Sequence, residues 1–178
     1  MEYIIETKRL NLRELKQLDF DNLKDIISDE ETMKYYPKSY DDNGVQKWLD
    51  WNFDNYKKYG FGLWAVELKD GIFIGDCGIT LQNIAGEEVF EIGYHVNKKY
   101  WKNGYASEAA KACKKWFFEN TSNTEVYSYM NIDNLASRGV ATNNGMAFVK
   151  EYYDNDEHLV VYRIKKDEHL KETMNEQR

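Results

Sequence analysis

Apolar and polar positions along the chain follow two periods, which predict alternating strands and helices. Over residues 89–96 apolar and polar side chains alternate, as in a half-buried strand. From Gly104 to Phe117 the apolar residues recur at three- and four-residue steps, which predicts an amphipathic helix that ends at Asn120. We therefore expect a strand, a loop of small residues and a helix, and the rest of the chain is organised around this unit.

Two further helices are predicted before this unit, and both begin at aspartate residues. Asp19 can cap a helix that ends near Ser28. Asp41 or Asp42 can cap a second helix, which carries a mostly aromatic stripe and ends at Gly60.

The other apolar runs predict a mostly antiparallel sheet. A first strand, or a bent pair of strands, is expected near the N-terminus, and two later strands flank the tight-turn sequence Asp70-Gly71. The strands are expected at residues 3–15, 61–67, 72–81, 125–130, 148–153 and 159–165, and a short helix is expected from Asn134 to about Asn144.

These elements predict one α+β domain. The chain has 178 residues, a single proline and no evident linker, so residues 1–168 form one domain with room for a substantial core. Residues 169–178 have little apolar content, and we expect them to be a polar tail that frays.

Composition narrows the function classes. The net charge of −7 disfavours nucleic acid, whose phosphates bind clustered Lys and Arg, and suits a cationic amine. No apolar run is long enough to cross a bilayer, so a cytoplasmic protein without a membrane partner is expected. Cys77 and Cys113 fit two buried thiols better than a disulfide or a nucleophile, and the sequence predicts no metal site.

The loop before the central helix has the residues of a phosphate site. The first turn of a helix carries free N–H groups and the positive end of the helix dipole. Small residues at Gly104 and Ala106 would let a pyrophosphate approach the backbone. Taken alone, the same glycine also fits an ordinary turn.

Two motifs, which follow one another along the chain, favour the phosphate site over the ordinary turn. Residues 101–109 read WKNGYASEA, and about thirty residues further the chain reads NIDNLASRGVATNNGMAF. Together they resemble the GNAT superfamily of acetyl-CoA-dependent N-acetyltransferases. The branch that is most similar is that of the ribosomal-protein alanine N-acetyltransferases, of the RimJ and RimL type. Lys102 stands where that branch often has a second glycine, so the start of the loop is expected to differ in shape.

The resemblance implies a fold and a cofactor. The GNAT fold has a central, mostly antiparallel, twisted sheet of six to seven strands that is splayed between the fourth and fifth strands and flanked by about four helices. Acetyl-CoA lies in that gap, and a primary amine attacks it directly in a ternary complex. The cofactor-binding residues are then expected to be Tyr94, His95, Val96, Trp101, Lys102, Asn103, Gly104, Tyr105, Ala106, Ser107, Asn134 and Ser137.

Two residues are candidates for the base. Strand alternation places Glu91 and His95 on one face, about 13 Å apart at roughly 3.4 Å per residue. Glu91 is our first candidate because a carboxylate can take an amine proton through a water. His95 is the second, although its position near the phosphate loop also fits a cofactor contact. Either residue could instead be a solvated or hydrogen-bonded strand residue.

The group that assists the leaving thiolate is not the one common in the family. Many relatives use a tyrosine seven residues beyond the position of Asn134, and this chain has Ala141 there. Ser137 matches a serine of the similar branch and is our candidate donor to the sulfur, while Asn134 could bond the pantetheine amides. Both residues could also be local helix caps.

The residues that bind the acceptor amine are the part of the site that the sequence defines least. The family places it beside the first two helices, where Tyr35, Tyr36 and Trp51 are the candidate substrate-binding residues. Trp48 and Tyr56 are also candidates, although they fit a core role better. The sequence therefore predicts an N-acetyltransferase, monomeric or homodimeric, acting on a protein N-terminus or a small amine. A CoA-binding sensor without catalysis is the alternative, and a nucleotide-binding fold is disfavoured because the standard phosphate-loop motifs are absent.

Overall fold

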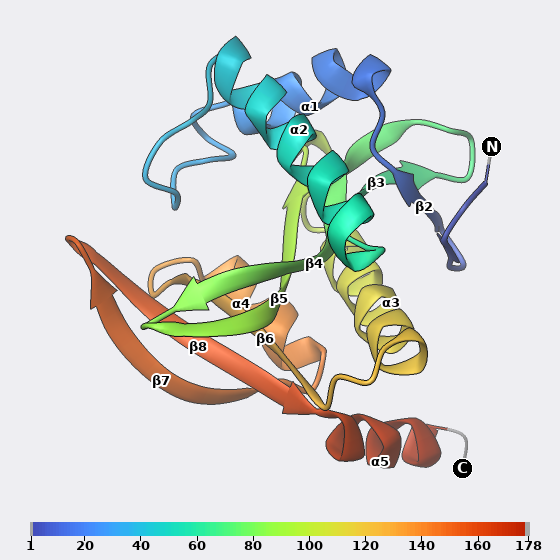
Figure 1. Cartoon of the computed structure of the whole chain (residues 1–178), viewed down its shortest axis with the longest axis vertical. Coiled ribbons are helices and arrows are strands. Elements are labelled where there is room, and N and C mark those ends of the chain that lie inside the picture. Colours follow the sequence, from blue (N-terminus) through green and yellow to red (C-terminus); the bar gives the residue numbers. More distant parts are fainter. Residues whose placement is uncertain (1, 177–178) are drawn as a thin grey trace.

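Eight strands form a single sheet in the computed structural model, which describes residues 2–176. Their order across the sheet is β1-β2-β3-β4-β5-β6-β8-β7. All neighbours are antiparallel except β5 and β6, which are parallel (Figure 1). The strands are β1 (Ile5–Glu6), β2 (Leu10–Glu14), β3 (Leu63–Leu68), β4 (Phe73–Ile84), β5 (Glu87–Val96), β6 (Glu125–Asn131), β7 (Ala147–Asp154) and β8 (Glu157–Lys165).

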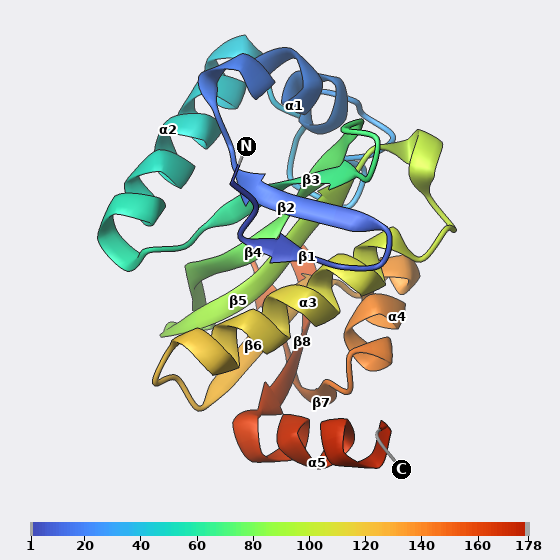
Figure 2. The ribbon, with the colours of Figure 1, turned by 90° about the vertical axis from the view of Figure 1, so that its right-hand side faces the viewer.

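Helices cover both faces of this sheet. The helices are α1 (Phe20–Ile27), α2 (Asp42–Tyr59), α3 (Tyr105–Asn120), α4 (Leu135–Asn143) and α5 (Lys166–Glu176). Figure 2 shows α3 lying across the strands with α4 beside it, while α1 and α2 pack together on the other side. None of the helices within residues 2–176 combines the length and the apolar content that a membrane span needs.

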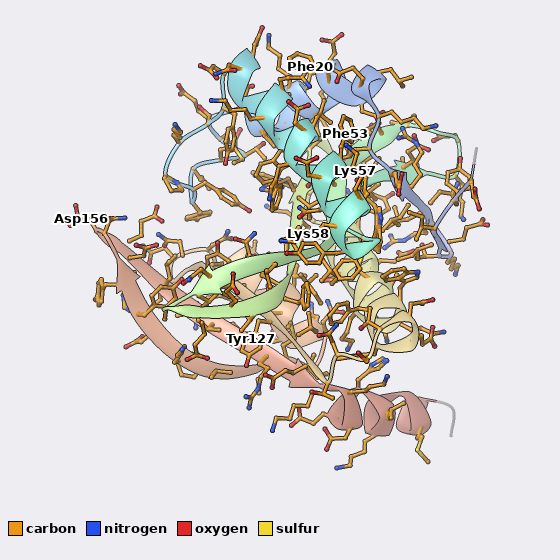
Figure 3. All side chains as sticks on the ribbon, in the orientation of Figure 1. Phe20, Phe53, Lys57, Lys58, Tyr127 and Asp156 are labelled. Carbon is orange, nitrogen blue, oxygen red and sulfur yellow. The ribbon has the colours of Figure 1, made fainter. Side chains whose placement is uncertain are left out.

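The two larger apolar clusters join helices to opposite faces of the sheet. The larger cluster joins α3 to β3, β4 and β5 through residues such as Trp64, Ile92 and Phe117. The second cluster joins α1 and α2 to the opposite face, and it includes Phe20 and Phe53, which Figure 3 labels. The sheet is therefore packed between helices on both of its faces.

The predicted architecture is confirmed, with more elements than expected. The strand, loop and helix unit around residues 89–120 is present, and α2 is capped by the Asp41 carboxylate, which accepts a hydrogen bond from the Gly44 N–H at 2.8 Å. The strand count is eight instead of six to seven because the N-terminal segment forms a pair of strands, β1 and β2. Cys77 and Cys113 are buried and free, as expected.

The expectation that the tail frays is wrong. Residues up to Glu176 form α5, which begins directly after β8. The His169 ring stacks on Phe118 of α3, with ring centroids 5.4 Å apart. The Glu168 carboxylate also accepts a hydrogen bond from the Lys165 N–H at 2.8 Å. The Lys166 N–H also donates to the Thr124 carbonyl at 2.8 Å, so backbone, ring and carboxylate contacts together hold a segment whose composition is almost entirely polar.

The expectation that Asp19 caps the first helix is also wrong. Asp19 precedes α1, but its side chain makes no capping bond to that helix. Instead its two oxygens accept hydrogen bonds from the Arg13 guanidinium at 2.7 and 2.8 Å. Arg13 Nε also donates to Glu67 of β3 at 2.9 Å, and all three side chains are buried. This triad ties β2 and β3 to the start of α1.

Removal of the positive charge from this triad should destabilise the folded protein. We expect Arg13→Met to lower the free energy of unfolding by about 3–5 kcal/mol, because Asp19 and Glu67 would remain buried without their partner. Urea unfolding followed by circular dichroism measures the change. Lys57→Met is the matched control, since Lys57 pairs with Asp54 at 3.5 Å on a side chain that is 78% exposed. Equal unfolding midpoints for the two variants would contradict the role of the triad.

Candidate functional site

The site is built on a gap in the sheet. β5 and β6 pair at one position, Glu91 opposite Tyr127 (labelled in Figure 3), and Ser128 Oγ donates to the Ile92 carbonyl at 3.2 Å. Beyond Ile92 the β5 backbone keeps its ladder with β4 as far as Val96, while its pairing with β6 has ended. The expected splay is therefore present, between β5 and β6 because the N-terminal segment forms two strands.

The loop before α3 opens beside this gap. Gly104 occupies the N-cap position with φ +78°, a conformation that favours glycine, and it has no side chain to cap the helix. The N–H groups of Tyr105, Ala106 and Ser107 therefore start the helix without intrahelical acceptors. Lys102 also adopts a positive φ, +61°, a left-handed conformation that costs lysine more than glycine.

The turn between β1 and β2 clamps this loop from outside. Arg9 donates to the Asn103 carbonyl at 2.9 Å, and its guanidinium lies 4.6 Å from the centre of the Tyr105 ring. Glu108 in the first turn of α3 accepts hydrogen bonds from Thr7 Oγ1 at 2.7 Å and from Arg9 Nε at 2.6 Å. Burial raises the pKa of Glu108, but these hydrogen bonds outweigh it and lower the pKa overall. The sequence did not indicate this clamp, because its partners lie about a hundred residues apart.

A cavity of about 670 Å³ lies between the loop, the strand β5, the helix α4 and the segment that joins α1 to α2. It contains most of the predicted site residues. Those that line it are Tyr35, Tyr36, Tyr94, His95, Val96, Trp101, Lys102, Gly104, Tyr105, Ala106, Ser107, Asn134 and Ser137.

Three predicted site residues lie outside the lining. Asn103 is exposed and donates to the carbonyls of Tyr100 and Trp101 at 3.1 and 3.0 Å, so it shapes the loop instead. Trp51 packs on Trp48, with ring centroids 5.4 Å apart, behind the cavity wall. Glu91 is buried in β5.

Tyr94 and Ser137 join β5 to α4 across the gap. Their hydroxyl oxygens are 2.7 Å apart, and Tyr94 also donates to the Ser137 carbonyl at 3.1 Å. The Asn134 side chain accepts a hydrogen bond from the Ser137 N–H at 3.1 Å, so the capping interpretation holds for Asn134. Ala141 is only 2% exposed and belongs to the core, so its position does not face the cavity. The phenol next to Ser137 therefore comes from β5.

Glu91 is a buried carboxyl with a shifted pKa. It is 8% exposed, and burial raises its pKa from 4.5 to about 8. Its carboxyl bends over the next residue on the same face: Oε2 lies 3.1 Å from the place of a Cβ on Gly93. Glycine at that position leaves the space that the carboxyl occupies.

His95 has a partner that sequence analysis missed. Its Nδ1 lies 2.9 Å from Oδ1 of Asp76, which is completely buried on β4. Trp48 Nε1 donates to the other oxygen of Asp76 at 3.1 Å. The signal was available: counting back from the turn at residues 85–86 places Asp76 opposite His95 in an antiparallel hairpin, as the register shows.

Of the other two aromatic candidates, one belongs to the apolar core and one supports the wall of the cavity. Tyr56 is a core residue, because its hydroxyl donates to the Leu63 carbonyl and accepts from the Leu15 N–H at 3.1 Å. Trp48 contacts the His95 ring, with centroids 5.2 Å apart, and so supports the wall from behind.

Comparison with known proteins gives a consistent result. Residues 9–147 match the family described as acetyltransferase (GNAT) domain. The chain is 35% identical over 161 residues to the uncharacterized protein YkkB of Bacillus subtilis strain 168, covering 89% of this chain and 94% of YkkB. Among solved structures, an acetyltransferase from Agrobacterium tumefaciens strain C58 superposes with a TM-score of 0.80 at 27% identity, covering 92% of this chain and 94% of that one.

A more distant structure shares the fold alone. The RimL ribosomal L7/L12 α-N-protein acetyltransferase, in complex with coenzyme A, has a TM-score of 0.76 at 16% identity. The superposition covers 94% of this chain and 99% of that one.

The raised pKa of Glu91 predicts how stability depends on pH. Between about pH 4.5 and pH 8 the unfolded chain releases this proton while the folded chain keeps it, so the wild type loses stability as the pH rises. Glu91→Gln removes this pH-dependent contribution to stability, because glutamine does not ionise. The stability of Glu91→Gln relative to the wild type should therefore rise across this window by about 5 kcal/mol.

Urea unfolding at a series of pH values measures this difference. Glu88→Gln, a change at an exposed position of the same strand, should give a curve that runs parallel to the wild type. A parallel curve for Glu91→Gln would show that Glu91 ionises normally in the folded protein.

Proposed function

This chain belongs to the acetyltransferase (GNAT) domain family, and we propose that it transfers the acetyl group of acetyl-CoA to a primary amine. One observation carries the proposal: a single cavity runs from the start of α3 to residues 94–96 of β5, where β5 is no longer paired with β6. A diphosphate at the loop and a thioester in the gap can then occupy one continuous space. The acidic net charge of −7 is compatible with a cationic acceptor.

The residues of the cavity fit coenzyme A as the co-substrate. The free N–H groups of Tyr105, Ala106 and Ser107 would hold the diphosphate, because they point out of a helix N-terminus. The pantetheine arm would follow the exposed edge of β5, where Tyr94, His95 and Val96 lie beyond the last pairing with β6. Trp101 donates its indole N–H to the Val96 carbonyl at 2.7 Å and so fixes the loop to that edge.

Glu91 is the proposed base for the attacking nitrogen. A neutral amine must attack the thioester carbon, and the nitrogen must then lose a proton for the amide to form. A carboxyl whose pKa is about 8 is a stronger base than an ordinary glutamate once it is ionised. Its position on β5, at the start of the gap, allows transfer through a water molecule.

Ser137 is the proposed hydrogen-bond donor to the departing sulfur. Its hydroxyl lines the cavity and shares a hydrogen with Tyr94, at 2.7 Å. A thiolate with a pKa near about 8.5 needs only modest assistance. Tyr94 can restore the hydrogen to Ser137 after the step, so the pair performs the task that a tyrosine at position 141 performs in many relatives.

The acceptor side is formed by the segment between α1 and α2. Tyr35 and Tyr36 line the cavity there, and we propose that they contact the acceptor, with Trp51 behind them. The RimL enzyme named above is a protein N-acetyltransferase of the same fold. A protein or peptide N-terminus and a small amine are the two acceptor classes that the proposal includes.

Acetyl transfer can be tested with a panel of amines and a thiol reagent. We expect acetyl-CoA to release free thiol only when a suitable amine is present. Gly104→Ala should raise the KM for acetyl-CoA about tenfold, because a Cβ in the phosphate loop holds the diphosphate away. Gly71→Ala is the matched control, since Gly71 has a similar φ of +86° in the β3–β4 turn and should leave KM unchanged.

The opposite result has a clear meaning. A protein that binds CoA but releases no thiol with any amine would be a sensor module, and the proposed transfer reaction would be wrong.

Ser137 can be tested separately from binding. Ser137→Ala should lower kcat about 10- to 100-fold and change the dissociation constant of CoA by less than threefold, because the hydroxyl acts on the leaving sulfur. Thr142→Ala is the control: this exposed α4 hydroxyl bonds the Arg138 carbonyl of its own helix at 3.1 Å. If kcat for Ser137→Ala equals that of the control, Ser137 has only a structural role.

A further inference from the structure

A fully buried aspartate holds the histidine of the cavity wall in one orientation. Asp76 Oδ1 accepts from the backbone N–H of His95 at 3.1 Å and faces His95 Nδ1 at 2.9 Å. Its second oxygen accepts from Trp48 at 3.1 Å. Three donors thus converge on one carboxylate that is 0% exposed. Hydrogen bonds to a buried carboxylate are strong and directional, so the imidazole cannot rotate freely.

The orientation defines which ring nitrogen can accept a proton. A carboxylate only accepts hydrogen bonds, so Nδ1 of the neutral ring carries the hydrogen and Nε2 carries the lone pair. His95 is 6% exposed, and among residues 2–176 its buried Nε2 has no hydrogen-bond partner. The ring contributes to the wall of the cavity. A buried basic nitrogen without a partner is costly unless a ligand supplies the hydrogen.

Two aromatic rings flank the imidazole. The Tyr36 and Trp48 rings lie 5.0 and 5.2 Å from it, measured between ring centroids. Tyr36 also lines the cavity, and the face of a tyrosine ring attracts an ammonium group. The cavity beside His95 therefore suits a cation that can also donate a hydrogen bond.

The titratable neighbours of His95 come from three elements. β4 presents Asp76, and the segment between α1 and α2 presents Tyr36. β5 itself presents Glu91, four residues before His95 on the same face. α2 presents Trp48, which has no charge. Glu31 and Lys34 line the same cavity.

The proposed reaction needs two proton acceptors. An acceptor amine arrives mostly as an ammonium ion. Two protons must leave its nitrogen: one before the attack, to free the lone pair, and one after the attack, to give the neutral amide. Glu91 can take only one of them in a turnover.

We propose that His95, oriented by Asp76, is a second proton-accepting residue of this site and that it deprotonates the ammonium form of the acceptor. This inference rests on the proposed acetyl transfer. His95 is then a catalytic residue, because Nε2 touches the reacting nitrogen, and Asp76 is its positioning residue.

The protons and bonds balance in this scheme. Nε2 takes the first proton and becomes part of an imidazolium that Asp76 stabilises. The freed lone pair forms the C–N bond, Glu91 takes the second proton, and the C–S bond breaks with its electron pair on sulfur. Ser137 donates a proton to that sulfur and regains one from Tyr94, which in turn takes the proton of Glu91 through water, while His95 returns its proton to solvent. One proton is released overall.

Two variants test this inference with the full-length protein and the amine found active in the thiol assay. His95→Gln and Asp76→Asn should each lower kcat/KM for the amine at least 100-fold at neutral pH and leave the dissociation constant of CoA within about twofold. The double variant should be no slower than either single one, because the two residues act as a unit. His158→Gln and Asp54→Asn, at exposed or half-exposed positions away from the cavity, should match the wild type.

The pH profile separates His95 from Glu91. Because both groups must be unprotonated to accept a proton, both act on the acid limb of the kcat/KM profile. Glu91→Gln should remove one of the two ionisations on that limb, and Asp76→Asn should shift the ionisation that remains. A merely structural role of Asp76 would lower the whole profile without changing its shape. In addition, the nitrogen chemical shifts of His95 in the wild-type CoA complex should show hydrogen on Nδ1 and a free lone pair on Nε2, a result that needs no variant to fold.

Each outcome decides the matter. A wild type that releases thiol, with variants of equal kcat/KM, overturns this inference and leaves the proposed function in place. Hydrogen on Nε2 in the wild type also overturns it. A wild type that releases no thiol with any amine overturns the proposed function itself, and this inference with it.

Discussion

The separation of β5 from β6 after Glu91 is the constraint on which the site depends. A continuous sheet would use the backbone groups of residues 92–96 for pairing on both sides and would leave no space for a ligand between the strands. Here β4 holds one side of β5 through a regular ladder, while the other side opens into the cavity. Apolar clusters on both faces hold the sheet to the helices and so fix the position of β5.

This arrangement also explains the chemistry of the buried polar groups. Glu91 and His95 alternate with apolar residues on β5, so both lie on the face beneath the segment that joins α1 to α2. The space that Gly93 leaves is taken by the Glu91 carboxyl, and burial there favours its protonated form. His95 instead has a buried carboxylate beside it. One strand therefore presents two groups whose surroundings differ, which suits two different proton transfers.

Much of the fold could be predicted because it depends on local signals. The turn at Gly71, the caps at Asp41 and Asn134, and the helical period after Gly104 are all interactions between residues close in sequence. Long-range partners were harder to predict. Asp19 looked like a helix cap because nothing in its neighbourhood indicates that Arg13 and Glu67 enclose it. The C-terminal helix was missed because long-range contacts, such as those of His169 with Phe118 and of Lys166 with Thr124, hold a polar segment.

The residues of the candidate site likewise divide into those that local motifs locate and those that depend on long-range contacts. The loop residues and Ser137 could be located from the motifs, whereas Asp76 and the clamp of Arg9 on Glu108 required the register of the sheet. The central claim is that the cavity holds coenzyme A across the gap. A crystal structure with bound CoA tests it most directly. The account predicts the diphosphate on the N–H groups of residues 105–107 and the pantetheine arm between β5 and β6. A CoA molecule bound elsewhere, with the gap closed by side chains, would contradict it.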